Sequence, residues 1–184
     1  MTSRLFIALH IPEEVVEKII YMRDEIYPND SIVRWEAKSK LHITLKFLGD
    51  TQKELIEPLI IQLESIFKNI SVFELTFEKF GIFKRKGLPK VIWAGLTNNQ
   101  YITNIVSKIN DELQSLGFEK EERSFNPHLT LLRVRGRENF ENISKFSDLN
   151  FEKIKFTGNK ISLFESKLLK SGSVYKSIKS FDLK

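Results

Sequence analysis

Two short stretches of this 184-residue chain repeat a four-residue frame that could do acid–base chemistry. One stretch, LHITLKFLGD, places His42 and Thr44 two positions apart. The other, NPHLTLLRVR, places His128 and Thr130 at the same spacing, and each threonine is again followed by leucine. The chain has only three histidines, so two of the three lie in this frame. Repetition of a rare residue in one frame indicates a shared role.

The chemistry of the frame follows from strand geometry. In a β-strand, residues i and i+2 point to the same side, so each frame presents an imidazole beside a hydroxyl. An imidazole titrates near about pH 6.5, so one of the two rings, His42 or His128, can be neutral while the other is charged. The neutral ring can take a proton from water, and the charged ring can give one to a leaving oxygen. Thr44 and Thr130 can donate hydrogen bonds to negatively charged oxygens. In-line displacement at a phosphodiester needs these groups and no metal, and neither frame has the second closely spaced ligand of a zinc site.

Two further cations are close to the frames in sequence. Arg133 could make a bidentate contact with a phosphate, but strict alternation puts it on the opposite face from His128. It would reach the site only through a β-bulge, strand twist or the length of its own side chain. Lys46 is expected on the face of His42, where it either adds positive potential or ends a strand in solvent.

The charge balance points weakly to nucleic acid. The net charge is +5, which attracts polyanions, although scattered surface lysines would give the same excess. The basic clusters are FKRKGLPK and RVRGR, and the loop at 84–90 either touches an RNA backbone or is a charged hairpin turn. The chain has no cysteine and no apolar run of the roughly 18 residues that span a bilayer. We therefore expect a cytoplasmic protein without disulfides or a thiol nucleophile.

Strands and helices alternate along the chain in an α+β pattern. The hydrophobic periodicity predicts helices at 12–27, 50–67, 99–118 and near 138–147, strands at 4–9, 42–48, 72–83, 90–97 and 128–134, and two or three more strands after residue 150. Thr51 and Glu54 have the spacing of a capping box and predict a helix start there, with Pro58 delaying or kinking that helix. The two frames lie one in each half, which indicates two lobes facing across a cleft.

Four other residues have open or structural interpretations. Trp35, Phe47 and Trp93 could stack on a base, but core packing is favoured for Phe47 and Trp93, and Trp35 stays undecided. His10 lies on an apolar strand without a partner motif, so we expect it to have a structural role.

Taken together, these blocks resemble the 2H phosphoesterase superfamily, which is defined by two His-x-Thr/Ser-x motifs. The closest likeness is to its RNA 2′,3′-cyclic phosphodiesterases, the LigT/ThpR proteins, also called bacterial-type 2′-5′ RNA ligases. The likeness extends to RLFIAL near the start, to RW ahead of LHITLKFLGD, and to PKVIWAGL and FNPHLTLLR, in the family's order over at least residues 4–135. His10 departs from the acidic or amide residue of many relatives.

The resemblance implies a fold and an activity. It implies one bilobal LigT-like domain over residues 1–184, with two antiparallel sheets flanked by helices around a central cleft. It implies opening of a 2′,3′-cyclic phosphate, on an RNA 3′ end or a nucleotide, to a 2′-phosphate without metal or other cofactor. Apart from the resemblance, nothing in the sequence calls for more than a monomer or for a membrane partner, so we expect neither.

The resemblance also implies a role for each site residue. His42 would be the proton donor toward the leaving 3′ oxygen, and His128 the proton acceptor that activates water. Thr44, Thr130 and Arg133 would bind the phosphate. Two alternatives stay open: 2′-5′ joining of tRNA halves by the same groups, and a non-catalytic module that only binds nucleotide or RNA.

Overall fold

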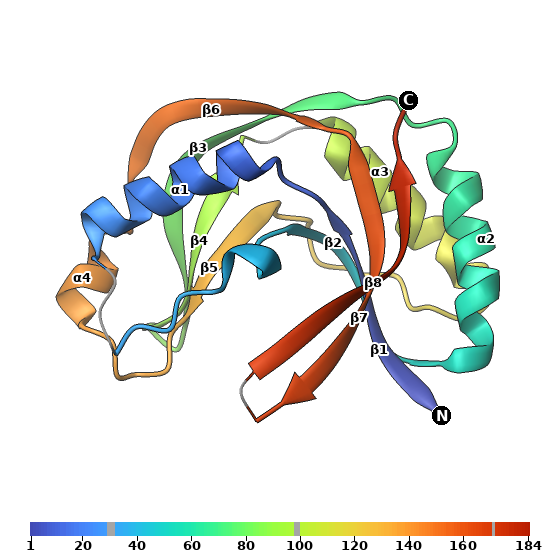
Figure 1. The fold of residues 1–184 in the computed structure, drawn as a ribbon, viewed down its shortest axis with the longest axis horizontal. Coiled ribbons are helices and arrows are strands. Elements are labelled where there is room, and N and C mark those ends of the chain that lie inside the picture. The colour runs from blue at the N-terminus through green and yellow to red at the C-terminus, as the bar shows by residue number, and fades with distance from the viewer. Residues whose placement is uncertain (29–31, 98–99, 171) are drawn as a thin grey trace.

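The computed structural model describes residues 1–28, 32–97, 100–170 and 172–184, which form one layer of strands flanked by helices (Figure 1). Within these residues the strands make one antiparallel sheet in the order β6-β3-β4-β5-β2-β1-β7-β8. The α+β class is confirmed. The elements are β1 (Thr2–Leu9), α1 (Glu13–Ile26), β2 (Ile43–Gln52), α2 (Ile56–Phe67), β3 (Phe73–Arg85), β4 (Leu88–Leu96), α3 (Gln100–Glu112), β5 (His128–Arg133), α4 (Phe140–Ser144), β6 (Asn150–Gly158), β7 (Lys160–Leu169) and β8 (Gly172–Asp182).

The sheet has two halves that meet between the two motif strands. β2 is followed outward by β1, β7 and β8, and β5 is followed outward by β4, β3 and β6. A single pair, Ile43 with Leu129, joins β2 to β5. The two expected sheets are therefore continuous, because the motif strands are the innermost strand of each half and lie close enough to pair. This short junction brings both frames to the middle of the molecule.

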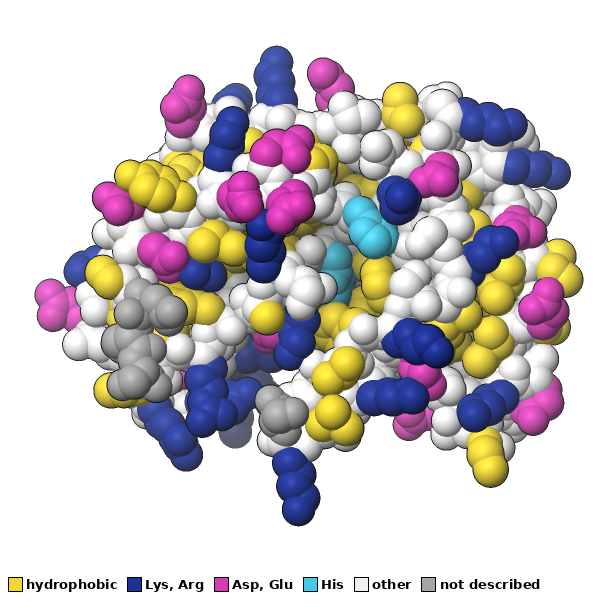
Figure 2. Space-filling view, in the orientation of Figure 1, with side chains coloured by type: hydrophobic (Ala, Val, Ile, Leu, Met, Phe, Trp, Pro, Cys, Tyr) yellow, Lys and Arg dark blue, Asp and Glu magenta, His cyan; other side chains and the backbone are white. Residues whose placement is uncertain are grey.

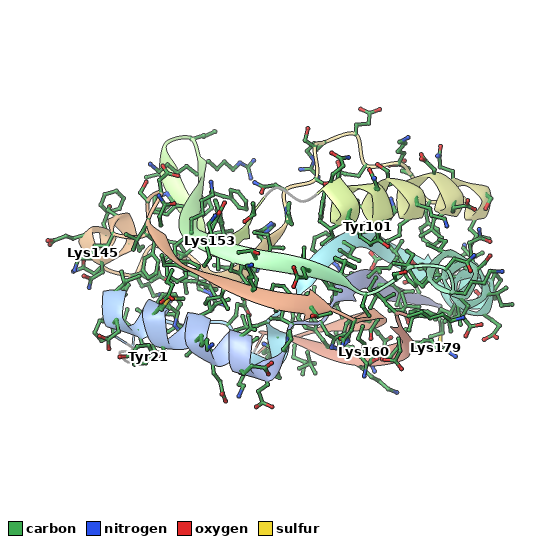
Figure 3. All side chains as sticks on the ribbon, turned by 90° about the horizontal axis from the view of Figure 1, so that it is seen from above. Tyr21, Tyr101, Lys145, Lys153, Lys160 and Lys179 are labelled. Carbon is green, nitrogen blue, oxygen red and sulfur yellow. The ribbon has the colours of Figure 1, made fainter. Side chains whose placement is uncertain are left out.

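Two helices, α1 and α3, lie beside the half of the sheet that they do not follow in sequence. α1 follows β1 but lies beside the half built from β3 to β6, whereas α3 follows β4 but packs near β2 of the other half (Figure 1). Figure 3 shows α1, which carries Tyr21, and α3, which carries Tyr101, on opposite faces of the sheet. No helix in the described ranges is long and apolar enough to cross a membrane.

Apolar residues inside the motif strands anchor the site to the core. Ile43 and Leu129 are fully buried, and Leu45, Leu131 and Leu132 are nearly or fully buried. Truncating such a side chain to alanine typically costs about 2–5 kcal/mol. The polar members of each frame are therefore held by neighbours that cannot move independently.

The start of α2 differs from the capping-box prediction. Thr51 does not cap a helix, because β2 continues past it and Thr51 pairs with Ser3 of β1. A 3₁₀ turn that contains Glu54 follows, and α2 begins only at Ile56. Pro58 lies in the first turn, where a missing backbone N–H costs nothing. The helix is thus delayed, and pairing with β1 outweighs the local capping signal.

Candidate active site

A β-bulge in β5 decides where its arginine points. The pairing with β4 skips Leu131, and Leu131 and Leu132 are both fully buried. One extra residue in a strand reverses the alternation beyond it. Arg133 therefore points to the same side as His128 and Thr130, which strict alternation alone would not allow.

β2 contains a matching bulge. Its pairing with β1 skips Leu45, so that Leu45 and Lys46 are both buried. Beyond the bulge Phe47 is 70% exposed and lines the same cleft as His42 and Thr44. Two predictions are therefore wrong: Lys46 does not share the face of His42, and Phe47 does not pack in the core.

Lys46 extends beneath α3 instead of into the cleft. Its Nζ donates to the side-chain Oδ1 of Asn110 at 2.5 Å and to the backbone oxygen of Glu119 at 2.7 Å. Burial lowers the pKa of Lys46, and the carboxylate of Glu121 raises it. Lys46 thus ties β2 to the segment that follows α3.

Both frames open into one cleft of about 540 Å³ at the junction of the two halves. The five residues predicted for the site all line it: His42, Thr44, His128, Thr130 and Arg133. Figure 2 shows histidine side chains near the centre of this face. Lining residues that the sequence did not suggest include Arg4, Phe6, Glu36, Lys40, Phe83, Ser166, Ser173 and Tyr175.

Aromatic rings surround His42. Its ring stacks on Phe6 with the centroids 5.0 Å apart, and on Phe164 at 5.9 Å. The edge contact with Tyr175 is 5.4 Å. Phe6 comes from β1, while Phe164 and Tyr175 come from the β7–β8 hairpin. These aromatic neighbours limit the contact of the ring with water and so disfavour the charged imidazolium.

The pKa of His42 is accordingly low. Burial and the nearby positive charges of His10 and Arg133 lower the pKa to about 4, while a hydrogen bond to the backbone of Lys40 opposes this shift. The unliganded ring is therefore neutral at neutral pH.

His128 is held by a short hydrogen bond. Its Nδ1 lies 2.8 Å from the backbone oxygen of Asn126, and since a carbonyl only accepts, Nδ1 carries the proton. Nε2 of the neutral ring is then free to accept one. Phe83 packs edge-on against the ring at 4.9 Å. Burial and the charge of Arg133 lower the pKa of His128, and the bond to Asn126 raises it.

The segment before β2 supports Arg133. The backbone N–H of Glu36 donates to the oxygen of the bulged Leu131 at 2.8 Å, which satisfies a carbonyl that the ladder leaves free. The Glu36 carboxylate then lies 3.5 Å from Nε of Arg133. Arg133 is 59% exposed at its side chain, so its charge faces the open cleft.

The tryptophans belong to the packing of the fold. Trp93 is buried against Phe83, and a Cβ at Gly81 would overlap its ring, so the core interpretation is confirmed. Trp35, left undecided, lies under the guanidinium of Arg23 at 4.5 Å. It also packs against the hydrophobic core and is not exposed as a base platform.

His10 is part of a hydrogen-bonded chain beside His42. Its Nε2 lies 2.7 Å from the hydroxyl of Ser162, which lies 2.7 Å from that of Ser180. Burial and Lys160 lower the pKa of His10, whereas Asp182 raises it. The structural role expected for His10 agrees with these contacts.

The basic loop at 84–90 is the turn of the β3–β4 hairpin. Lys86 and Gly87 both have positive φ at its tip, and β3 pairs with β4 on either side of them. None of the loop residues, all of which the structure describes, lines the cleft.

Comparison with known proteins decides the family. A family model described as LigT-like phosphoesterase matches residues 9–93 and 95–175, which include both frames. The chain belongs to this LigT-like phosphoesterase family. The resemblance inferred from the two frames and their flanking blocks is confirmed.

Relatives cover nearly the whole chain of this LigT-like phosphoesterase. It is 31% identical over 182 residues to an RNA 2′,3′-cyclic phosphodiesterase of Methanocaldococcus jannaschii, covering 97% of this chain and 99% of the relative. A Thermotoga maritima protein of the same name is 29% identical over 174 residues, covering 94% and 91%.

Solved structures share the fold. The crystal structure of a Thermus thermophilus protein, TT0787, has a TM-score of 0.84 at 22% identity, covering 98% of this chain and 97% of the other. E. coli LigT complexed with 3′-AMP has a TM-score of 0.81 at 23% identity, covering 100% and 99%.

Proposed function

We propose that this LigT-like phosphoesterase hydrolyses 2′,3′-cyclic phosphates, on RNA 3′ ends or on nucleotides, to 2′-phosphates without metal or other cofactor. The observation that carries the proposal is the meeting of two His-x-Thr frames and a bulge-directed arginine in one cleft. Relatives such as the M. jannaschii RNA 2′,3′-cyclic phosphodiesterase support the substrate class.

The cleft residues divide the reaction between them. Nε2 of His128 accepts a proton from water, whose oxygen attacks phosphorus in line with the 3′ oxygen. The bond between phosphorus and the 3′ oxygen breaks, and His42 gives its proton to that oxygen. Thr44 and Thr130 donate hydrogen bonds to the non-bridging oxygens, and Arg133 stabilises the charge that develops on them.

The low pKa of His42 gives this mechanism a pH signature. A donor must be protonated, yet the free ring has a pKa of about 4. The negative charge of a bound phosphate favours the imidazolium and raises that pKa. Because kcat/KM reports the free enzyme and kcat the complex, the alkaline limb of kcat should lie at higher pH than that of kcat/KM.

The direct test is turnover of 2′,3′-cyclic AMP in excess EDTA, followed by ³¹P NMR. The proposal expects 2′-AMP as the product and no 3′-AMP. A His42→Ala/His128→Ala double variant, purified in parallel, measures any contaminating nuclease. A folded wild-type protein that turns over neither this nucleotide nor a cyclic-phosphate oligonucleotide would overturn the proposal, and tight nucleotide binding without turnover would favour a non-catalytic module.

A second candidate function is 2′-5′ joining of RNA fragments, which one feature favours. A groove of about 810 Å³ between α3 and residues 120–126 opens beside His128 and Thr44, and its lining includes the polar Ser107 and Asn110. On the proposed assignment the nucleophile arrives from the side of His128. A 5′ hydroxyl of a second fragment, seated in this groove, would then replace water.

Joining can be separated from hydrolysis by filling the groove. Ser107→Trp should lower the yield of a nuclease-resistant 2′-5′ junction from two RNA fragments, while hydrolysis of 2′,3′-cyclic AMP continues. Ser115→Trp, an exposed serine outside the groove lining, is the matched control. No junction from wild-type protein at any fragment concentration would remove this candidate.

The proposal also treats residues 1–184 as one domain that acts as a monomer. Size-exclusion chromatography coupled to light scattering, run at the protein concentration of the activity assay, tests this part. A dimer as the active species would contradict it.

A further inference from the structure

Three arginines gather in a small pocket just beyond the end of β5. The pocket measures about 310 Å³ and is lined by Ile32, Arg34, Arg135, Arg137 and Glu138. All three arginines are exposed. The chain between β5 and α4 runs along the lower left of Figure 1, and Figure 2 shows Lys and Arg side chains gathered in that region.

The positive charge of this arginine pocket is largely uncompensated. Glu138 uses its carboxylate to accept the backbone N–H of Arg135 at 3.0 Å and of Arg137 at 3.0 Å. Among the residues that the structure describes, the guanidiniums of Arg34, Arg135 and Arg137 form no ion pair, whereas Arg123 is paired with a carboxylate. Among the described residues that line the pocket, three guanidiniums face one carboxylate, so that the net charge of this lining is positive and attracts an anion.

The arginine pocket continues from the cleft along the chain. Arg133 lines the cleft, and Arg135 follows two residues later on a segment still held to β4 by the backbone bond from Val134 to Lys90. Extended chain advances about 3.3 Å per residue, so Arg133 and Arg135 are roughly 7 Å apart along the backbone. A nucleic acid strand that ends in the cleft can therefore reach the pocket with its next phosphates.

We propose that the arginine pocket binds phosphodiester groups of the RNA strand that precedes the cyclic phosphate. This rests on the proposed function, because it takes the cyclic phosphate to lie in the cleft. Guanidiniums match phosphate oxygens in a bidentate fork, and backbone contacts of this kind position a strand without reading its sequence. The preferred substrate is then an RNA end of any sequence and not a free cyclic nucleotide.

Two substrates distinguish binding in the arginine pocket from binding in the cleft. A six-nucleotide RNA ending in a 2′,3′-cyclic phosphate reaches both, whereas 2′,3′-cyclic AMP reaches only the cleft. For wild-type protein, kcat/KM should be higher for the RNA, and this advantage should shrink as salt rises, because bound phosphates release counterions.

An Arg135→Gln/Arg137→Gln variant should lose the RNA advantage. We expect kcat/KM for the RNA to fall about tenfold or more, kcat/KM for 2′,3′-cyclic AMP to stay within about twofold, and the logarithmic salt slope to become shallower by about 1.4, at about 0.7 per single-strand phosphate contact. The control is Lys108→Gln/Lys179→Gln, which removes the same charge elsewhere. Figure 3 shows Lys179 at the opposite end of the molecule from Lys145 of α4.

The outcomes distinguish this inference from the proposed function. If the double-arginine and double-lysine variants have the same kcat/KM for the RNA while 2′,3′-cyclic AMP is still hydrolysed, the arginine pocket does not bind RNA and the proposed function stands. If wild-type protein turns over neither substrate, the proposed function fails. Fluorescence anisotropy of a 5′-labelled six-nucleotide RNA ending in a 2′-phosphate then decides the inference alone: equal affinity of wild-type and double-arginine variants would overturn it.

Discussion

β2 and β5 each bring the same frame to the cleft, and the bulge of each strand turns a different residue toward it. Leu45 and Leu131 are the skipped residues. Beyond them β2 presents Phe47 and β5 presents Arg133. The same kind of bulge therefore adds an aromatic ring to the cleft from the strand of His42 and a guanidinium from the strand of His128.

The surroundings of the two imidazoles differ in the same sense. Both rings hydrogen-bond to the backbone two residues before them, but His42 is enclosed by Phe6, Phe164 and Tyr175, whereas His128 packs on the ring of Phe83 alone among the described residues. Identical frames therefore do not give identical acids. On the proposed mechanism, the division into a donor and an acceptor comes from the neighbours of each strand.

Removing either imidazole should have the largest effect on activity. Single His42→Ala and His128→Ala substitutions are expected to lower kcat/KM for 2′,3′-cyclic AMP by about 10²–10⁴. The double variant should fall little further, because groups that act in one step are not additive. Circular dichroism controls for folding, and a folded single variant with nearly full activity would contradict the comparison.

Arg133→Gln should be the next largest change. Loss of a cation aimed at developing charge costs about 10²–10³ in kcat. Because the charge of Arg133 lowers the pKa of both His42 and His128, both limbs of the pH–rate profile should also move to higher pH. Lys108→Gln removes one remote charge and should do neither. A lower rate with unmoved limbs would show that Arg133 acts without reaching the imidazoles.

Lys46 and Leu132 occupy equivalent positions after the frames, so Lys46→Met tests what the buried ammonium does. It takes a donor from Asn110 and from the oxygen of Glu119, and the free energy of unfolding should fall by about 1–3 kcal/mol. Activity at 25 °C should hardly change.

The matched control is Leu132→Met, a volume-conserving change that should cost less than about 1.5 kcal/mol. Urea unfolding followed by fluorescence measures both variants. A large loss of kcat in Lys46→Met without loss of stability would contradict this structural role and indicate that Lys46 acts on the reaction in the cleft.

The smallest expected effect belongs to His10. Its charge lowers the pKa of His42, so His10→Gln should raise that pKa and move the alkaline limb of kcat/KM to higher pH, with kcat at its optimum little changed. Lys160 and Asp182 also act on His10 and remain in place. Ser180→Ala breaks the hydrogen-bonded chain without removing a charge and should leave the limb where it is. An unmoved limb in His10→Gln would refute the electrostatic link.

The sequence was sufficient for the two frames and their strands but not for the bulges. Spacing alone singled out His42 and His128, and both residues line the same cleft. Lys46 and Phe47 were assigned to the wrong faces, because the bulge in β2 is set by its register with β1, which alternation within β2 cannot reveal. A signal was nevertheless present, since Phe47 and Arg133 occupy equivalent positions when the two frames are aligned, and a bulge was one of the three ways in which Arg133 could reach the site.

Local signals failed where long-range pairing competed with them. Thr51 has the right spacing to cap a helix, yet its backbone pairs with Ser3 at the other end of the β1–β2 ladder. The cleft residues Glu36 and Tyr175 were missed for a similar reason. Each lies outside both frames in sequence and reaches the cleft only through the order of the strands.

The central claim is that one frame supplies the acid and the other the base, and an aryl phosphodiester tests it most directly. Its leaving group departs without a proton, so an acid is not needed but a base still is. We predict that His42→Ala loses far less activity on the aryl ester than on 2′,3′-cyclic AMP, while His128→Ala loses about the same on both. The reverse pattern would exchange the two roles, and equal losses for both variants on both substrates would contradict a division between acid and base.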